Sequence, residues 1–140
     1  MSRLITISSD LASAFAGSEP AAQVAVLHFA CTHAVNENGL TGSDVDQALE
    51  AVQAAKLDPV LSKKLNDLSE TYDDRYFALT DEGGESPLLP GALENFLRAR
   101  AASALAFSLD TAQSPSEALY EAISASPDRD SLIAALRRML

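Results

Sequence analysis

The stretch from Pro90 to Asp110, PGALENFLRARAASALAFSLD, decides the fold that the sequence predicts. Proline costs no hydrogen bond in the first turn of a helix, and residues 91–110 contain no further proline. From Ala99 to Leu109 both faces of the helical wheel carry apolar or small side chains around Arg100. A helix without a polar side is surrounded by other helices. We therefore expect a central helix over 90–110 in an all-α protein.

A second buried helix is predicted over 20–38. No Asp, Glu, Lys or Arg occurs between Pro20 and Asn36, and apolar side chains fall on both sides of the wheel. Gly39 then supplies the left-handed stop that often ends a helix. We expect this helix to lie against the central one.

Five further helices are predicted around these two, each from a start signal followed by an apolar stripe at helical spacing. Leu4-Ile5-Thr6-Ile7 is expected to be a lead-in segment that packs on the core. The predicted architecture is a single domain over 1–140, an all-α bundle of about seven helices. The start signals are Ser8 or Ser9, Ser43, Asp58-Pro59, Ser114-Pro115 and Ser126-Pro127.

The charge balance limits the classes of partner. The chain has 20 Asp and Glu residues against 10 Lys and Arg residues, a net charge of -10. Such a surface repels phosphate, so we expect no nucleic-acid partner and no anionic membrane. It attracts a basic protein, although solubility alone also explains it. The single cysteine, Cys31, allows no internal disulfide and favours the cytoplasm, and Asp10 interrupts what would otherwise resemble a signal peptide.

Motifs for catalysis and cofactor binding are missing from the sequence. There is no GxSxG, GxxxxGK[ST] or GxGxxG pattern. His28 and Cys31 have metal-ligand spacing, but no second His or Cys pair completes a zinc site, and His33 falls on the far side of the helix. We expect no metal and no cofactor, and an enzyme stays open only as an alternative without residues to name.

Arg100 is the residue of the central helix that most needs a partner, because an unpaired buried guanidinium is strongly destabilising. The candidate partners are Asp73 and Asp74, which flank the predicted apolar stripe of Tyr72 and Tyr76, and Glu70 is a third. We favour an internal ion pair between two helices over an anion-binding pocket. Arg98, by contrast, is expected at the surface beside Glu94. The wheel surrounds Arg100 with Leu93, Phe96, Ala104 and Phe107.

The remaining signal is an acidic segment with aromatic residues among the acids. Buried aromatic side chains dominate many protein interfaces, and charge raises association rates, although a charged run is usually only a solvated face. The predicted partner-binding residues are Glu70, Tyr72, Asp73, Asp74, Tyr76, Phe77, Asp81, Glu82 and Glu85.

Three functions follow as hypotheses. The first is a non-catalytic module that binds a basic surface on another protein, with the charge and size of stoichiometric inhibitors such as immunity proteins or antitoxins. The second is a small-molecule-binding protein or enzyme that uses a pocket near Arg100. The third is a helical assembly subunit, and a homo-oligomer also stays open.

Overall fold

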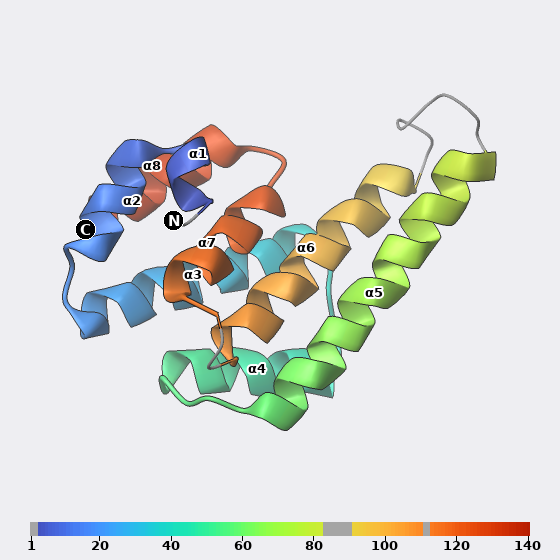
Figure 1. The fold of residues 1–140 in the computed structure, drawn as a ribbon, viewed down its shortest axis with the longest axis horizontal. Helices are drawn as coiled ribbons and strands as arrows, with labels where there is room; N and C mark the ends of the chain where they lie inside the picture. The colour runs from blue at the N-terminus through green and yellow to red at the C-terminus, as the bar shows by residue number, and fades with distance from the viewer. Residues whose placement is uncertain (1–2, 83–90, 111–112) are drawn as a thin grey trace.

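The computed structural model describes residues 3–82, 91–110 and 113–140, and these residues form eight helices and no strand (Figure 1). The expected all-α class is confirmed. The helix count is eight because Leu4–Ile7, the expected lead-in segment, forms one helical turn that buries Leu4 completely. The helices are α1 (Leu4–Ile7), α2 (Ser9–Ala16), α3 (Pro20–Glu37), α4 (Ser43–Gln53), α5 (Pro59–Glu82), α6 (Ala92–Ser108), α7 (Pro115–Ser124) and α8 (Arg129–Met139).

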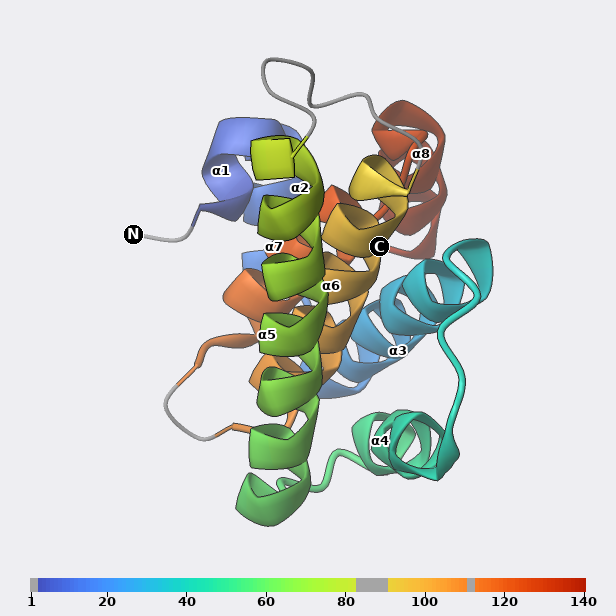
Figure 2. The same ribbon diagram turned by 90° about the vertical axis from the view of Figure 1, so that its right-hand side faces the viewer.

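α6 is the central helix of the fold, as its sequence predicts. It packs against α5, α7, α3 and α4, and every residue from Ala101 to Ala106 is buried. Figure 2 shows α6 between α5 on one side and α3 on the other. The small side chains of α6 explain this position, because they let several helices approach its backbone closely.

α5 and α6 form a long antiparallel pair joined by serine side chains. The Ser62 hydroxyl donates to the carbonyl of Ala106 at 2.7 Å, and the Ser69 hydroxyl donates to that of Ala99 at 2.9 Å. Ser103 lies 2.7 Å from Ser69, oxygen to oxygen. These buried hydroxyl groups are small enough to sit between two close helices, and their polar atoms are satisfied by hydrogen bonds.

α3 differs from the prediction that both of its sides are buried. One side contributes six residues to the core, whereas Ala21, Ala25 and Phe29 on the other side are exposed. In the described part of the chain, this side of α3 borders an open groove, with the end of α4 and the end of α8 at the edges of that groove. The buried residues are Val26, Leu27, Ala30, Cys31, Ala34 and Val35.

Three helix starts also differ from the sequence prediction. Ser43 is the first residue of α4 and not its cap, because the N-cap is Gly42 and no side chain caps this helix. α6 begins at Ala92 after Gly91, whose φ of 89° is left-handed, and Pro90 lies outside the described residues. α8 begins at Arg129, with Asp128 as its N-cap. The carboxylate of Asp128 accepts from the Ser131 N–H at 3.1 Å, so the cap lies beyond the Ser126-Pro127 signal.

Among the described residues, no helix combines the length and the apolar character needed to cross a bilayer.

Candidate functional site

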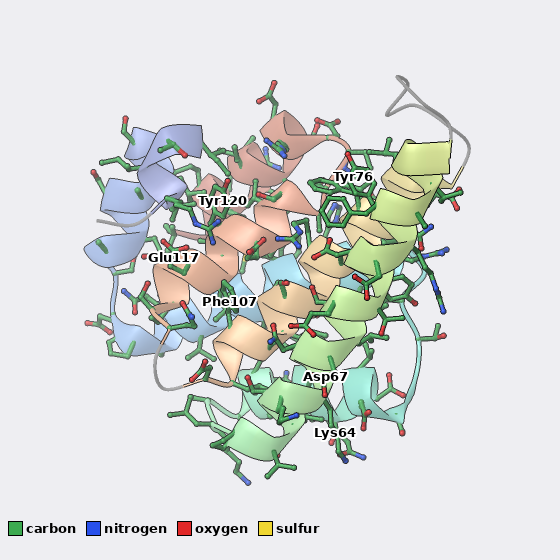
Figure 3. All side chains as sticks on the ribbon, turned by 45° about the vertical axis from the view of Figure 1, so that its right-hand side comes forward. Lys64, Asp67, Tyr76, Phe107, Glu117 and Tyr120 are labelled. Atoms are coloured by element: carbon green, nitrogen blue, oxygen red, sulfur yellow. The ribbon has the colours of Figure 1, made fainter. Side chains whose placement is uncertain are left out.

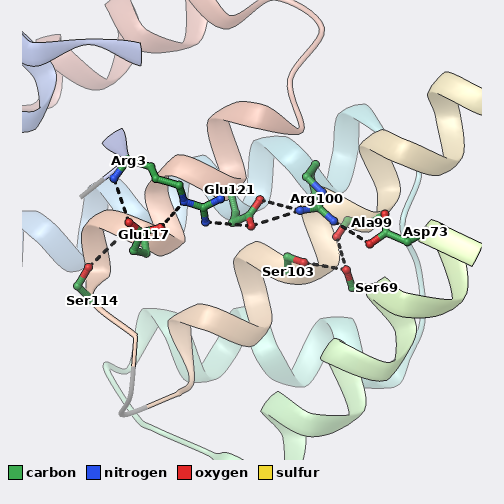
Figure 4. Close-up of polar contacts among 9 residues, drawn as sticks. All are labelled: Arg3, Ser69, Asp73, Ala99, Arg100, Ser103, Ser114, Glu117 and Glu121. Atoms are coloured by element: carbon green, nitrogen blue, oxygen red, sulfur yellow. Dashed lines mark hydrogen bonds and ion pairs between the residues drawn. The ribbon is translucent and has the colours of Figure 1, made fainter. Parts of the chain in front are cut away.

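Arg100 lies between two carboxylates from different helices (Figure 4). Its Nη2 atom is 2.9 Å from Oδ2 of Asp73 on α5, and its Nη1 atom is 3.4 Å from both carboxylate oxygens of Glu121 on α7. The Arg100 side chain is 22% exposed and that of Glu121 only 3%. The ion pair with Asp73 that the sequence suggested is therefore present, and Glu121 is a second partner that the sequence argument missed.

The row of charges continues from Glu121 to the start of the chain. Nη2 of Arg3 lies 3.4 Å from Oε1 of Glu121, and Nε of Arg3 lies 2.8 Å from Oε2 of Glu117. The backbone N–H of Arg3 donates to Glu117 as well, at 3.0 Å. These bonds from Arg3, with its positive charge, hold the pKa of Glu117 below its usual value. Asp73, Arg100, Glu121, Arg3 and Glu117 form the row that we call the ion chain.

The ion chain has a structural role in the packing of the helices. It connects α5, α6, α7 and the residue before α1, with charges that alternate in sign. Burying Glu121 without a partner would cost several kcal/mol by order of magnitude. Two guanidinium groups beside it offset that cost. Arg100 is thus occupied by carboxylates of the protein itself, which favours the interpretation as an internal ion pair over an anion pocket.

The sequence carries a signal for Glu121. It falls on the side of α7 formed by Ala118, Ala122 and Ala125, all of them small and fully buried. A carboxylate on such a side must meet a cation. Arg3 had no comparable signal, because its position depends on how the N-terminal segment folds back onto α7.

The helical period divides the predicted acidic site into an inner and an outer set. Tyr72, Asp73 and Tyr76 make contacts inside the protein. Tyr72 packs against the core, Asp73 pairs with Arg100, and the Tyr76 ring lies 5.5 Å from that of Phe96 on α6. Tyr76 is labelled in Figure 3. These three residues are therefore only partly exposed, and each makes contacts inside the protein.

The outer set forms an exposed row along α5. Glu70, Asp74 and Phe77 are exposed and stand at helical spacing on one side, with Phe77 57% exposed. Asp67 precedes them on the same side and lies 3.5 Å from Lys63. We call Glu70, Asp74 and Phe77 the α5 stripe. The side chains of Asp81 and Glu82 and the whole of Glu85 lie outside the described residues.

Arg98 has a different environment from the one predicted. It is half-buried, and its Nε donates to the carbonyl oxygen of Asn38 at 3.0 Å. Asn38 is the C-cap of α3, where carbonyl groups lack partners within the helix. Arg98 therefore joins the end of α3 to α6, while Glu94 is exposed.

The histidine and cysteine residues of α3 are not gathered into a metal site. Among the residues described, no group of three His, Cys, Asp or Glu side chains could hold a metal ion. Cys31 is fully buried, and this burial raises the pKa of its thiol to about 12. His33 lies 3.4 Å from Glu37, whereas His28 is half-buried in a groove outside α3.

This groove was not predicted from the sequence. It has a volume of about 660 Å³ and lies between the exposed side of α3, the end of α4 and the end of α8. None of its lining residues is Asp, Glu, Lys or Arg. Phe29 and Met139 at the groove are 42% and 41% exposed.

Comparison with protein-family models, with curated proteins and with solved structures finds no match to this chain.

Proposed function

We propose that this chain is a cytoplasmic, non-catalytic protein-binding module that acts through the α5 stripe, in the manner of a stoichiometric inhibitor. One observation carries the proposal: Phe77 is 57% exposed at the end of a row of exposed acids. A large apolar side chain beside charges of one sign is the composition of an interface anchor with an electrostatic guide.

The partner that fits this stripe has a basic surface with an apolar hollow. The negative field of the chain, whose net charge is -10, raises the rate of encounter with such a surface. Glu70 and Asp74 would then pair with cations at the rim of the interface, while burial of Phe77 provides most of the affinity. Since exposed charges are screened beyond about 8 Å at physiological ionic strength, added salt should slow association.

The experiment is affinity purification from the native cell with the wild-type chain and two variants. The first variant carries Glu70→Lys, Asp74→Lys and Phe77→Ala. Asp73 is left unchanged because it pairs with Arg100. The matched control carries Asp46→Lys and Glu50→Lys on α4, two exposed acids that give the same change in charge.

A protein that binds the wild type and the α4 control, but not the α5 variant, supports the proposal. Its association rate, measured by surface plasmon resonance, should fall as salt rises. Equal binding of one partner to all three proteins would remove the α5 stripe as the site. A small molecule that co-purifies with the wild type and the α5 variant alike, with no protein partner, would replace the proposal with the ligand-binding alternative.

A further inference from the structure

The groove on the exposed side of α3 has the size of a small-molecule site. It lies between α3, the end of α4 and the end of α8, and Figure 2 shows α8 above α3 and α4 below it. Its volume of about 660 Å³ falls within the range of about 300–1,000 Å³ that is typical of ligand pockets. Most of its lining is alanine, proline, valine, phenylalanine and methionine.

Two hydrogen-bonding side chains of α3 stand one turn apart in this apolar lining. His28 is half-buried, and the hydroxyl oxygen of Thr32 is buried without a hydrogen-bond partner in the part of the chain that the structure describes. A buried hydroxyl without a partner is unusual, because its loss of hydration is not offset. Threonine in a helix can turn its hydroxyl between two rotamers, so a ligand in the groove can supply the missing bond. A few polar groups among apolar ones are typical of a site that orients a ligand.

Ala55 lines the same groove in a strained backbone conformation. Its φ of 56° is left-handed, and no other residue except glycine has such a φ among the described residues. Ala55 directly follows the C-cap of α4, where glycine is favoured because it has no Cβ. Alanine instead keeps a methyl group on a residue of the groove. Strain of this kind is found most often at functional sites.

The charges of the groove favour an uncharged occupant. A carboxylate or phosphate would meet no Lys or Arg in the lining and would be repelled by a chain of net charge -10. An ammonium group would meet no Asp or Glu there, and burying an unpaired charge is unfavourable. A protein interface uses about 20–30 residues on each side, whereas eleven residues line the groove. A small uncharged molecule therefore fits the site better than an ion or a protein.

We infer that the groove binds a small, uncharged and mainly apolar ligand that carries a hydrogen-bonding group for His28 or Thr32. Phe29 and Met139, both partly exposed at the groove, would bury apolar surface against this ligand. No residue of α5 lines the groove, so the inference does not depend on the proposed function.

The test uses two fluorescent probes that share one aromatic skeleton. N-phenylnaphthylamine is uncharged and has one N–H donor, and anilinonaphthalenesulfonate is the same skeleton with a sulfonate group. Fluorescence titration of the intact chain measures the Kd of each probe. The diagnostic variant is Ala25→Lys, which places a cation in the groove at an exposed helical position. Ala134→Lys on α8 is the matched control, because Ala134 is exposed and does not line the groove.

We expect the uncharged probe to bind the wild type and Ala134→Lys at one site per chain. The sulfonate should bind both at least about tenfold more weakly, because the groove offers its charge no cation. Ala25→Lys should reverse this order by weakening the uncharged probe and strengthening the sulfonate. The variant of the α5 stripe should bind the uncharged probe like the wild type, which distinguishes a failure of this inference from a failure of the proposed function.

Three results would overturn the inference, provided that circular dichroism shows each variant to be folded. The first is a wild type that binds the uncharged probe without saturation or binds the two probes equally. The second is an equal effect of the two lysines. The third concerns a second copy of the chain as the occupant: sedimentation equilibrium would show the mass doubling with concentration while the probe is released.

Discussion

Glu121 is 2% exposed as a whole residue and lies between two guanidinium groups. Burial of its carboxylate therefore costs little free energy only while those two cations are present. Arg100→Ala should lower the free energy of unfolding by about 2–3 kcal/mol, less than the loss of a fully buried partner, because Arg3 still faces Glu121. Arg3→Ala is the control. Arg3 is 49% exposed, so its loss should be smaller, about 1 kcal/mol or less. Urea unfolding curves with equal losses for the two variants would contradict this ranking.

Cys31 gives the second prediction at the residue scale. Its thiol is fully buried and its pKa is raised to about 12, so almost no reactive thiolate exists near neutral pH. We expect a thiol reagent to label the native chain very slowly and the urea-unfolded chain promptly. Ser13→Cys on the exposed side of α2, in a Cys31→Ser background, is the control that should react at once. Labelling of native Cys31 at the control's rate would mean that the core opens at α3.

The starts of α7 and α8 show what a local sequence signal can and cannot fix. Ser114-Pro115 and Ser126-Pro127 are the same pattern, yet only Ser114 caps its helix, accepting from the Glu117 N–H. Ser126 is instead buried, and Asp128 two residues later takes the cap of α8. Ser126 lies in the core, 3% exposed, and this burial is not visible in a local sequence pattern.

The cap of α8 leads to a prediction about acid. Hydrogen bonds from the Ser131 hydroxyl and then its backbone N–H hold the pKa of Asp128 below its usual value. A carboxylate whose pKa is lowered on folding stabilises the fold above its unfolded pKa of about 4, and this contribution is lost as pH falls through the folded pKa. Asp128→Ala should therefore destabilise the protein at neutral pH, and the difference from wild type should shrink on acidification below about pH 4. Thermal melts across this range measure the difference, which would stay constant if Asp128 acted only by packing.

The α5–α6 pair makes a prediction about packing between elements. Ser69 is 3% exposed and bonds to both Ala99 and Ser103 on α6. Ser69→Ala should cost about 1–2 kcal/mol because Ser103 loses a buried partner. Ser69→Leu should cost more, since it forces a large side chain between close helices. Urea unfolding of both variants tests this order, and an equal or smaller loss for leucine would show that the two helices can move apart.

The predictions that succeeded depend on local sequence pattern, whereas the features that were missed depend on how the helices pack. The all-α class and the central position of α6 followed from spacing alone, because an alanine-rich helix without a polar side has few other solutions. Asp73 was a candidate for Arg100 because it flanks the apolar stripe of Tyr72 and Tyr76 that the sequence predicts. Glu121, Arg3 and the open side of α3 were missed, because each depends on which helices meet in space. A wheel shows that a side is apolar but not whether the fold supplies enough helices to cover it.

At the scale of the whole molecule, the acids behind the net charge of -10 are in different environments. Asp73 is bound within the ion chain, whereas Glu70 and Asp74 stand exposed on the α5 stripe. Exposed acids of a strongly negative chain repel one another and oppose the compact state. Retaining them is reasonable if they serve a partner, as the proposed function requires. Salt should then raise the thermal stability of the free chain while it slows the binding of a basic partner.

The neighbouring residues Asp73 and Asp74 allow this division of charge to be tested in one comparison. Asp73→Lys and Asp74→Lys each remove a negative charge and add a positive one, which changes the net charge from -10 to -8. We expect Asp74→Lys to leave stability equal or slightly raised, because it relieves repulsion at an exposed site. Asp73→Lys should lower it by several kcal/mol, since it places a cation against Arg100, 2.9 Å from the present carboxylate. Thermal melts at low and high salt distinguish the two effects: screening should remove the gain from Asp74→Lys but restore little of the loss from Asp73→Lys. Equal behaviour of the two variants would mean that Asp73 is solvated like its neighbour and that the ion chain does not hold α5 to α6.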